Sequence, residues 1–376
     1  MDRALAVTLI ALGLFLSVGL LTVVGAAVGE SGVPPGEEPD RAHRRRARIA
    51  AVAAAAFLVL GLVGGRRWWN GEDRAYQMQL FRPVHATATV MEQGNARVLQ
   101  LAIDDPNWIN RNWTPLIPDH GKLMHLFLVR LPAHDAFAHL HPVMRDSSHF
   151  EATLPPIPAG RYRVYADIVH ENGLAETLVA SADLPVAGSG GGGAAVASTE
   201  EPGGDPDDSW SAAAPAQAAS SAEARFTLRD GSTLVWQRGP EPLVEGRDRP
   251  LRFEVRARDG RPALLEPYLG MPAHAVVTRE DGAVFAHLHP VGTISMASQM
   301  ALMMRTPADT LPGSLGRRLS AMHEMAEPAR VADPPGTFSI PYGFPSPGRY
   351  RLWVQIKLRG EVQTAVFDVA VAAGRA

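Results

Sequence analysis

Apolar residues form two uninterrupted runs near the N-terminus and short alternating stretches over the rest of the chain. Residues 4–28 carry no charged side chain, and residues 49–65 form a second apolar run of 17 residues. A helix of about 20 apolar residues spans the hydrocarbon core of a bilayer. Both runs are therefore predicted to be membrane helices, at about 4–28 and 49–65, which form a transmembrane hairpin within residues 1–66.

The segment between the two runs predicts the orientation of the hairpin. Residues 29–48 hold Arg41, Arg44, Arg45, Arg46 and Arg48. Arginine-rich loops remain in the cytoplasm, so everything after the second run is expected on the periplasmic side of the cell inner membrane. Two alternatives remain open: the first run is a cleaved signal peptide, or the two runs are buried helices of a soluble protein.

From about residue 81 onward, apolar and polar residues alternate with the two-residue period of β-strands. Clusters of Pro, Gly, Asn and Asp separate the stretches, which predicts an antiparallel β-sandwich of immunoglobulin-like type over residues 81–187. The predicted strands of this first module are residues 85–91, 96–103, 123–130, 137–141, 150–154, 161–170 and 174–184.

A second module of the same kind is predicted over residues 225–373. Its predicted strands are residues 232–237, 251–257, 273–279, 283–289, 337–341, 349–358 and 362–371. Residues 188–224 are rich in Gly, Ala, Ser and Pro, and are predicted to be a flexible linker that leaves the two modules free to reorient. The predicted fold is thus mainly β, with two tandem immunoglobulin-like antiparallel β-sandwiches after an N-terminal two-helix transmembrane hairpin.

An internal repeat supports this organisation. Phe-Ala-His-Leu-His-Pro-Val occurs at residues 137–143 and again at 285–291, and Gly-Arg-Tyr-Arg occurs at 160–163 and 348–351. A further histidine precedes each first motif, His125 in one copy and His274 in the other. The chain therefore contains two copies of one module, and three histidines recur in each copy.

The second copy predicts the geometry of its own histidines. Asp281-Gly282 lies between two apolar stretches and is a strong signal for a two-residue hairpin turn. Such a turn pairs His274 with His289, and strand alternation then places His287 on the same face. The opposite face, predicted to face the core, carries Ala275, Val277, Val284, Ala286 and Leu288.

The first copy gives the same arrangement with a longer loop at residues 131–135. His125 is expected to face His141, with His139 diagonal to it. Opposed Cβ atoms on paired strands are about 4.5–5.5 Å apart, so the three imidazoles of each copy can converge on one ion. The residues predicted to face the core are Leu126, Leu128, Ala138 and Leu140.

The composition limits the metals that such sites can bind. The chain has no cysteine, which excludes thiolate ligands and disulfides. Imidazole suits copper and zinc, and also nickel and iron, while an added thioether favours copper. Further candidate ligands are Asp167, His170 and Met271. The second copy has Gln355 and Leu358 where the first has Asp167 and His170, so the two sites are expected to differ.

Other histidines and many methionines lie in loops and in an insertion of the second module. His120, His134 and His149 lack counterparts and are predicted to be solvated loop residues. The insertion, at about 292–336, contains His323 and the methionines Met296, Met300, Met303, Met304, Met322 and Met325. Residues 295–305 are predicted to be a helix with four of these methionines along one side. They either pack this helix onto the sandwich or supply thioether ligands for Cu(I) near His287 and His289.

Several classes of function are disfavoured. The formal net charge is −3, and the sequence lacks a basic patch with interleaved aromatic residues, so a nucleic-acid partner is not expected. No nucleophile elbow, phosphate-binding loop, dinucleotide fingerprint or His-Glu-x-x-His motif occurs. The protein is therefore not expected to be an enzyme.

The first copy resembles a known group of proteins in three segments: Met124-His125-Leu126, the motif at residues 137–142 and the Pro-Ala-Gly-Arg-Tyr-Arg block. This group is the bacterial extracytoplasmic His-Leu-His-Pro heavy-metal-binding proteins, which are loosely similar to the copper-resistance and YtkA-like immunoglobulin-like domains. The resemblance covers about 65 residues of the first copy and parts of the second. It implies a β-sandwich that binds metal, with copper favoured, at His125, His139 and His141, and by transfer at His274, His287 and His289 of the second copy.

Together these observations predict a membrane-anchored extracytoplasmic protein that binds copper, as Cu(I) or Cu(II), with zinc as the alternative metal. Copper handling, resistance or delivery is the expected role. The alternative is a structural or interaction protein of the cell envelope, whose histidine hairpins are scaffold and bind no metal. The expected partners are a metal ion, the membrane and a protein of the envelope.

Overall fold

The computed structural model describes residues 3–30, 36–38, 40–79, 83–94, 96–105, 108, 115–186, 204–212, 217–218, 222–325 and 335–374. The chain divides into two compact units, Met1–Arg82 and Pro83–Ala376. Each unit is described by itself.

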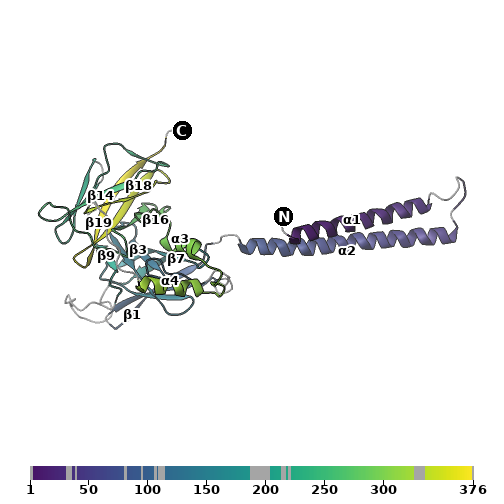
Figure 1. The fold of residues 1–376 in the computed structure, drawn as a ribbon, viewed down its shortest axis with the longest axis horizontal. Coiled ribbons are helices and arrows are strands. Elements are labelled where there is room, and N and C mark those ends of the chain that lie inside the picture. The colour runs from purple at the N-terminus through teal and green to yellow at the C-terminus, as the bar shows by residue number, and fades with distance from the viewer. Residues whose placement is uncertain are drawn as a thin grey trace. The chain divides into compact units, whose positions relative to one another are not determined.

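The first unit consists of two helices, α1 (Arg3–Glu30) and α2 (Arg41–Gln79) (Figure 1). The ring of Phe15 in α1 stacks on that of Phe57 in α2, with centroids 4.0 Å apart. Among the described residues, one helix, Arg41–Tyr76, is long and apolar enough to cross a membrane, and Ala11–Val23 is a shorter apolar stretch. An apolar helix compatible with membrane anchoring is thus present, whereas the two-helix transmembrane hairpin stays a prediction.

The second unit begins with two sheets that enclose one core. The first sheet has the order β1 (Ala86–Gln93), β2 (Ala96–Ile103), β6 (His149–Thr153), β5 (Val143–Met144). The second has the order β8 (Ala175–Leu184), β7 (Gly160–Val169), β3 (His125–Arg130), β4 (Ala136–Leu140), β9 (Ser209–Ala212). Leu99, Leu128 and Phe150 are buried in the core between them. All seven strands predicted for this module are present, because the alternation of its residues matches the two faces of each sheet.

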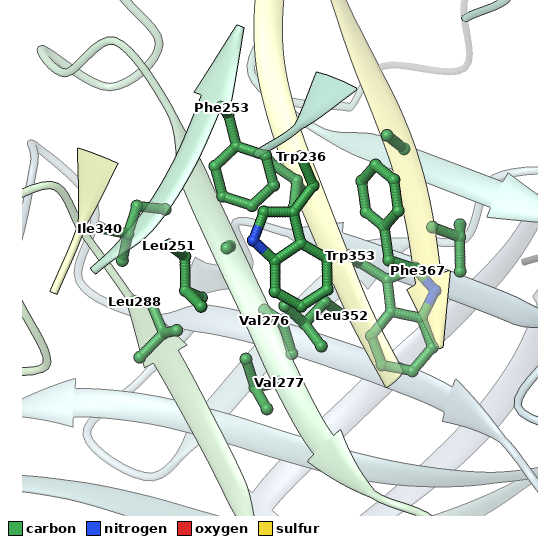
Figure 2. Close-up of a cluster of buried hydrophobic side chains, with 14 of the residues drawn as sticks. Trp236, Leu251, Phe253, Val276, Val277, Leu288, Ile340, Leu352, Trp353 and Phe367 are labelled. Carbon is green, nitrogen blue, oxygen red and sulfur yellow. The ribbon is translucent and has the colours of Figure 1, made fainter. Parts of the chain in front are cut away.

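A second pair of sheets follows. One has the order β11 (Ala224–Thr227), β12 (Thr233–Trp236), β14 (Leu251–Arg256), β17 (Thr337–Ile340). The other has the order β10 (Gln217–Ala218), β19 (Glu361–Ala372), β18 (Gly348–Leu358), β15 (His274–Arg279), β16 (Phe285–Leu288), and β13 (Leu243–Val244) also pairs with β19. Figure 2 shows Trp236 and Phe253 in the core of this sandwich, where the indole of Trp236 also contacts Phe367.

Part of the predicted flexible linker is ordered as strands. Residues Ser209–Ala212 form β9, which pairs antiparallel with β4 of the first sandwich. Residues Gln217–Ala218 form β10, which pairs parallel with β19 of the second. The prediction of a flexible linker over 188–224 is therefore wrong for these segments, because two exposed sheet edges supply backbone partners that composition cannot reveal. Residues 187–203 lie outside the described residues.

The outer faces of the two larger sheets pack against each other. Phe127 and Phe137 of the first sandwich belong to the same buried apolar cluster as Trp353 of the second. Phe137 stacks on Trp353 with centroids 4.9 Å apart, and Phe285 stacks on Tyr165 at 3.9 Å. The expectation that the two modules reorient freely is wrong, because this aromatic interface is buried.

These contacts are reciprocal between the two copies. Phe137 and Phe285 hold the same place in the repeated motif, and Tyr165 and Trp353 hold the same place after the second shared block. Each copy therefore offers the same surface to the other, as in an isologous dimer. The arginines of the second block follow the same rule: Arg163 Nη1 donates to the carbonyl of Gly282, and Arg351 Nη1 donates to that of His134.

The insertion of the second sandwich packs on the first. It forms α3 (Met296–Met304), capped by Ser295, and α4 (Ser314–Met325). In Figure 1 both helices lie beside β7 of the first sandwich. The carboxylate of Glu171 accepts the backbone N–H groups of Gly313 and Leu315 at the start of α4, which satisfies donors that a helix leaves unpaired. The insertion thus fixes the two sandwiches to each other.

Candidate metal centre

Both histidine hairpins have the predicted register. Val276 pairs with His287 and Thr278 with Phe285 in the second copy, and Phe127 pairs with His139 in the first. The turn differs in detail: Gly282 N–H donates to Arg279 and Arg279 N–H to Val284, which gives a four-residue connection. The predicted core-facing residues of both hairpins lie in the apolar cores or pack against them.

The opposite faces carry the histidines, and these faces meet at the interface between the sandwiches. Within each copy the three predicted imidazoles converge. The ring centroids of His125, His139 and His141 are 4.7–5.3 Å apart, and those of His274, His287 and His289 are 4.4–5.5 Å apart. We call these six residues together with His120 the histidine cluster. All seven are buried.

The possible ligand atoms of these histidines form two groups that cross the interface between the copies. One group of possible ligand atoms, all within 4.8 Å of one another, belongs to His125, His139 and His287. A second belongs to His120, His274 and His289. We call these the first triad and the second triad. These groups differ from the expected set of three histidines in each module, because the copies pack through their histidine-bearing faces and each triad takes residues from both.

The outer nitrogens of the first triad are held by oxygen acceptors. His125 Nε2 donates to the carbonyl of Asp119 at 3.1 Å, and His139 Nδ1 donates to Gln355 Oε1 at 3.0 Å. His287 Nδ1 lies 3.3 Å from a carboxylate oxygen of Asp167. Histidines that bind metals almost always donate their second N–H in this way.

These contacts determine the tautomers of His125 and His139. A neutral imidazole has one N–H, so the inner atoms, His125 Nδ1 and His139 Nε2, each carry a bare lone pair. They lie 3.1 Å apart. The inner Nε2 of His287 is buried and has no hydrogen-bond partner among the described residues. Two lone pairs that face each other, with a ligand atom of His287 within 4.8 Å of them, suit a shared cation.

Burial keeps these imidazoles neutral. Desolvation, reinforced by neighbouring histidines, holds the pKa of His125 and that of His139 well below the ordinary value. For the same reasons the pKa of His287 falls to about 3. Burial likewise lowers the pKa of His274 and that of His289. Neutral imidazole is the form that binds metal.

The second triad includes His120, which was expected to be solvated. His120 is only 8% exposed, and its ring centroid lies 5.2 Å from that of His274 and 5.0 Å from that of His289. The prediction of a solvated loop residue is wrong because the second sandwich covers this loop. His134 is buried as well, 7% exposed, whereas His149 bonds to Asp146 near the surface.

A third group combines His141 with Asp205 and Asp208. His141 Nδ1 lies 3.0 Å from Asp208 Oδ1, and Lys122 forms an ion pair with Asp205. Since the lysine already balances this carboxylate, the group orients the ring of His141. The other ring nitrogen, Nε2, is buried and has no hydrogen-bond partner among the described residues.

The three remaining candidate ligands have different positions. Asp167 is at the first triad, as the partner of His287. His170 is not, because it lies three residues further along and so on the other side of the strand; its Nε2 bonds to Glu176 Oε1 at 2.7 Å. Met271 is buried, and its backbone bonds to that of Tyr268. A ligand role for Met271 stays a prediction.

The methionines of α3 differ in their surroundings. Met300 and Met304 pack against an apolar cluster that includes Ile117 and Val169 of the first sandwich. Met303 is 83% exposed. The structure therefore favours the packing hypothesis for Met300 and Met304, whereas Met303 is exposed to solvent. The side chains of His323 and Met325 lie outside the described residues.

Two further residues complete the surroundings of His139. Gln355, counterpart of Asp167, accepts from its ring and is itself buried. The Tyr268 hydroxyl lies 3.2 Å from the same nitrogen and donates to the carbonyl of Asp207. The alignment of the two copies identifies Gln355 as the counterpart of Asp167, a candidate ligand. Only the packing of the copies shows that Gln355 bonds to His139 of the other module.

Comparisons with known proteins give one family. A family model described as Domain of unknown function (DUF8832) matches residues 83–183 and 226–373. No curated protein matches the chain. The chain is similar to a solved structure of a chimeric titin Z1Z2 functionalized with a KLER exogenous peptide from decorin, at 10% identity over 78% of this chain and 100% of that one, with a TM-score of 0.15.

Two bacterial structures are also similar. A putative membrane anchored protein from Corynebacterium diphtheriae matches at 11% identity over 77% of this chain and 59% of its own, with a TM-score of 0.17. Fibronectin(III)-like modules of CbhA from Clostridium thermocellum match at 7% identity over 77% and 90%, with a TM-score of 0.16. At these TM-scores the likenesses do not inform on fold or function. Because the family model covers most of the chain, the protein belongs to the family described as Domain of unknown function (DUF8832).

Proposed function

We propose that the protein is a membrane-anchored extracytoplasmic copper-binding protein that holds its ion between two immunoglobulin-like sandwiches. One observation carries the proposal: His125 and His139 direct bare nitrogens at each other, a ligand atom of His287 lies within 4.8 Å of them, and the outer nitrogens of the three residues contact oxygen atoms. A scaffold role would leave these lone pairs opposed, which costs free energy, whereas a bound cation stabilises them.

Copper is favoured over zinc by the charge of the surroundings. The first triad offers three neutral imidazoles and one nearby carboxylate, Asp167, which is partly buried. Imidazole binds both metals, but each uncompensated charge in a protein interior costs several kcal/mol, in order of magnitude. A monovalent Cu(I) ion is balanced by Asp167, and a divalent ion is not. The resemblance to heavy-metal-binding proteins supports the same metal.

The remaining parts of the proposal concern place and role. The arginines between the two N-terminal apolar runs favour insertion in the inner membrane with the sandwiches in the periplasm. Binding is favoured over catalysis because His125, His139 and His287 are at most 8% exposed, which leaves a substrate no access. Copper resistance, storage or delivery to an envelope protein fits an enclosed ion.

Removal of two ligands tests the proposal. The full-length protein in detergent is titrated with Cu(I) and with Zn(II), and compared with the double variant His139→Ala, His287→Ala. We expect the copper affinity of the first triad to fall by more than about 100-fold, because even outer-shell substitutions at metal sites cost about 10- to 100-fold. His85→Ala is the matched control, since this side chain is 72% exposed. Equal copper binding by the double variant and the unchanged protein would contradict the proposal.

A further inference from the structure

We propose that the second triad, His120, His274 and His289, binds a second ion beside the first, and that both ions are monovalent and soft, Cu(I) or Ag(I). This inference rests on the proposed function, because it extends the same interface from one ion to two. The second triad draws two ligands from the second sandwich and one from the first, the reverse of the first triad.

The buried nitrogens of His274 and His289 carry the inference. These side chains are 0% and 2% exposed. Neither ring nitrogen of either residue has a hydrogen-bond partner among the described residues. A buried polar group without a partner costs about 1–3 kcal/mol, so imidazoles that serve as scaffold are normally bonded. Unbonded rings that converge with a third imidazole match the needs of a ligand set.

The third ligand comes from a turn that both copies share. Asp119-His120-Gly121-Lys122 and Tyr268-Leu269-Gly270-Met271 occupy equivalent places, and each closes with a backbone bridge. His120 has a φ of 51°, and so does its counterpart Leu269. The backbone is thus the same, and only the first sandwich places an imidazole there. The second ion site is therefore specific to one end of the interface.

The charges near the triads favour monovalent ions. Each triad has one carboxylate beside it: Asp167 at the first, and Asp119, 3.7 Å from His120 Nε2, at the second. The triads are adjacent, with the ring centroids of His287 and His289 4.4 Å apart. Two divalent ions this close would leave two charges uncompensated and would repel each other strongly in a medium of low dielectric constant. Two monovalent ions would be balanced.

Silver stoichiometry tests the second site. Ag(I) is an air-stable probe for a soft monovalent site, and the full-length protein in detergent would be incubated with excess Ag(I), desalted and analysed for bound metal per chain. We expect two Ag(I) ions in the unchanged protein and one in His120→Leu. Leucine is the matched replacement, because Leu269 occupies the equivalent turn at the same φ. His289→Asn, in a different element, is expected to give one ion as well.

The outcomes separate the two proposals. One Ag(I) ion in the unchanged protein, or two in both His120→Leu and His289→Asn, would overturn the second site and leave the proposed function standing. No bound Ag(I) in the unchanged protein would overturn both. A parallel incubation with Zn(II) is expected to give at most one ion per chain, and two bound Zn(II) ions would overturn the assignment of monovalent charge. Circular dichroism of each variant confirms that it is folded.

Discussion

Lowering the pH from 7 to 5 is expected to unfold the metal-free protein or to separate its two sandwiches. Buried imidazoles cause this effect, because their pKa values in the folded state lie below the ordinary value of about 6.5. The residues concerned are His125, His139, His274, His287 and His289. Below pH 6.5 the unfolded chain binds protons that the folded chain cannot bind, so the free energy of unfolding falls with the pH.

The size of the effect follows from the number of groups. Each imidazole held neutral lowers the free energy of unfolding by about 1.4 kcal/mol per pH unit below its ordinary pKa. Two carboxyl groups act in the opposite direction, because burial raises the pKa of Asp167 to about 7 and also raises that of Asp119. The effect of at least three imidazoles therefore remains uncompensated, and the free energy of unfolding is expected to fall by about 4 kcal/mol per pH unit. The total free energy of unfolding of a typical domain is about 5–15 kcal/mol.

Urea unfolding of the metal-free protein at a series of pH values between 7 and 5 measures this slope. His274→Leu is expected to flatten it, because the substitution removes one buried imidazole whose two nitrogens lack hydrogen bonds among the described residues. Bound copper competes with protons and should move the transition to lower pH. A change of less than about 1 kcal/mol between pH 7 and 5.5 would contradict the prediction.

Phe137→Ala is expected to destabilise the protein and to weaken metal binding together. Phe137 is fully buried and stacks on Trp353 of the other sandwich, with ring planes 13° apart. Truncation of a buried phenylalanine costs about 3–5 kcal/mol. It also loosens the interface that holds His287 opposite His125 and His139, so we expect copper affinity to fall by about tenfold or more through loss of preorganisation.

Phe150→Ala is the matched control for this prediction. Phe150 is equally buried, but it lies in the core within the first sandwich. Its truncation should lower the free energy of unfolding by a similar amount and leave the copper affinity of the folded protein unchanged. Unfolding curves and copper titrations of the two variants would be compared at the same temperature. Equal copper affinity of Phe137→Ala and Phe150→Ala would show that the interface does not assemble the site.

The strands and the histidine faces could be predicted because they depend on local pattern. Residue alternation determines which face a side chain occupies, and the pairing of Val276 with His287 follows from the apolar stretches on both sides of the turn. The same alternation predicts which apolar residues face the core. Local pattern could not predict β9, because Ser209–Ala212 is a strand only where β4 offers a free edge.

The composition of each triad could not be predicted, because it depends on how two similar surfaces meet. The repeat shows that both copies carry three histidines, and it gives no distance between copies. His287 joins His125 and His139 only because the aromatic rings of the interface set the two sheets face to face. His120 could be recognised only by aligning its turn with that of Leu269 and asking why one copy departs from the other.

The reciprocal stacking has a consequence for how such a centre could arise. A chain with one copy could form these contacts only by meeting a second molecule, and its ligand set would then come apart on dilution. Fusion into one polypeptide keeps the halves together at a constant effective concentration. Fusion also allows the sequences of the two halves to differ. One half can then carry His120 where the other carries Leu269, so that a centre formed by two similar halves has two unlike ends.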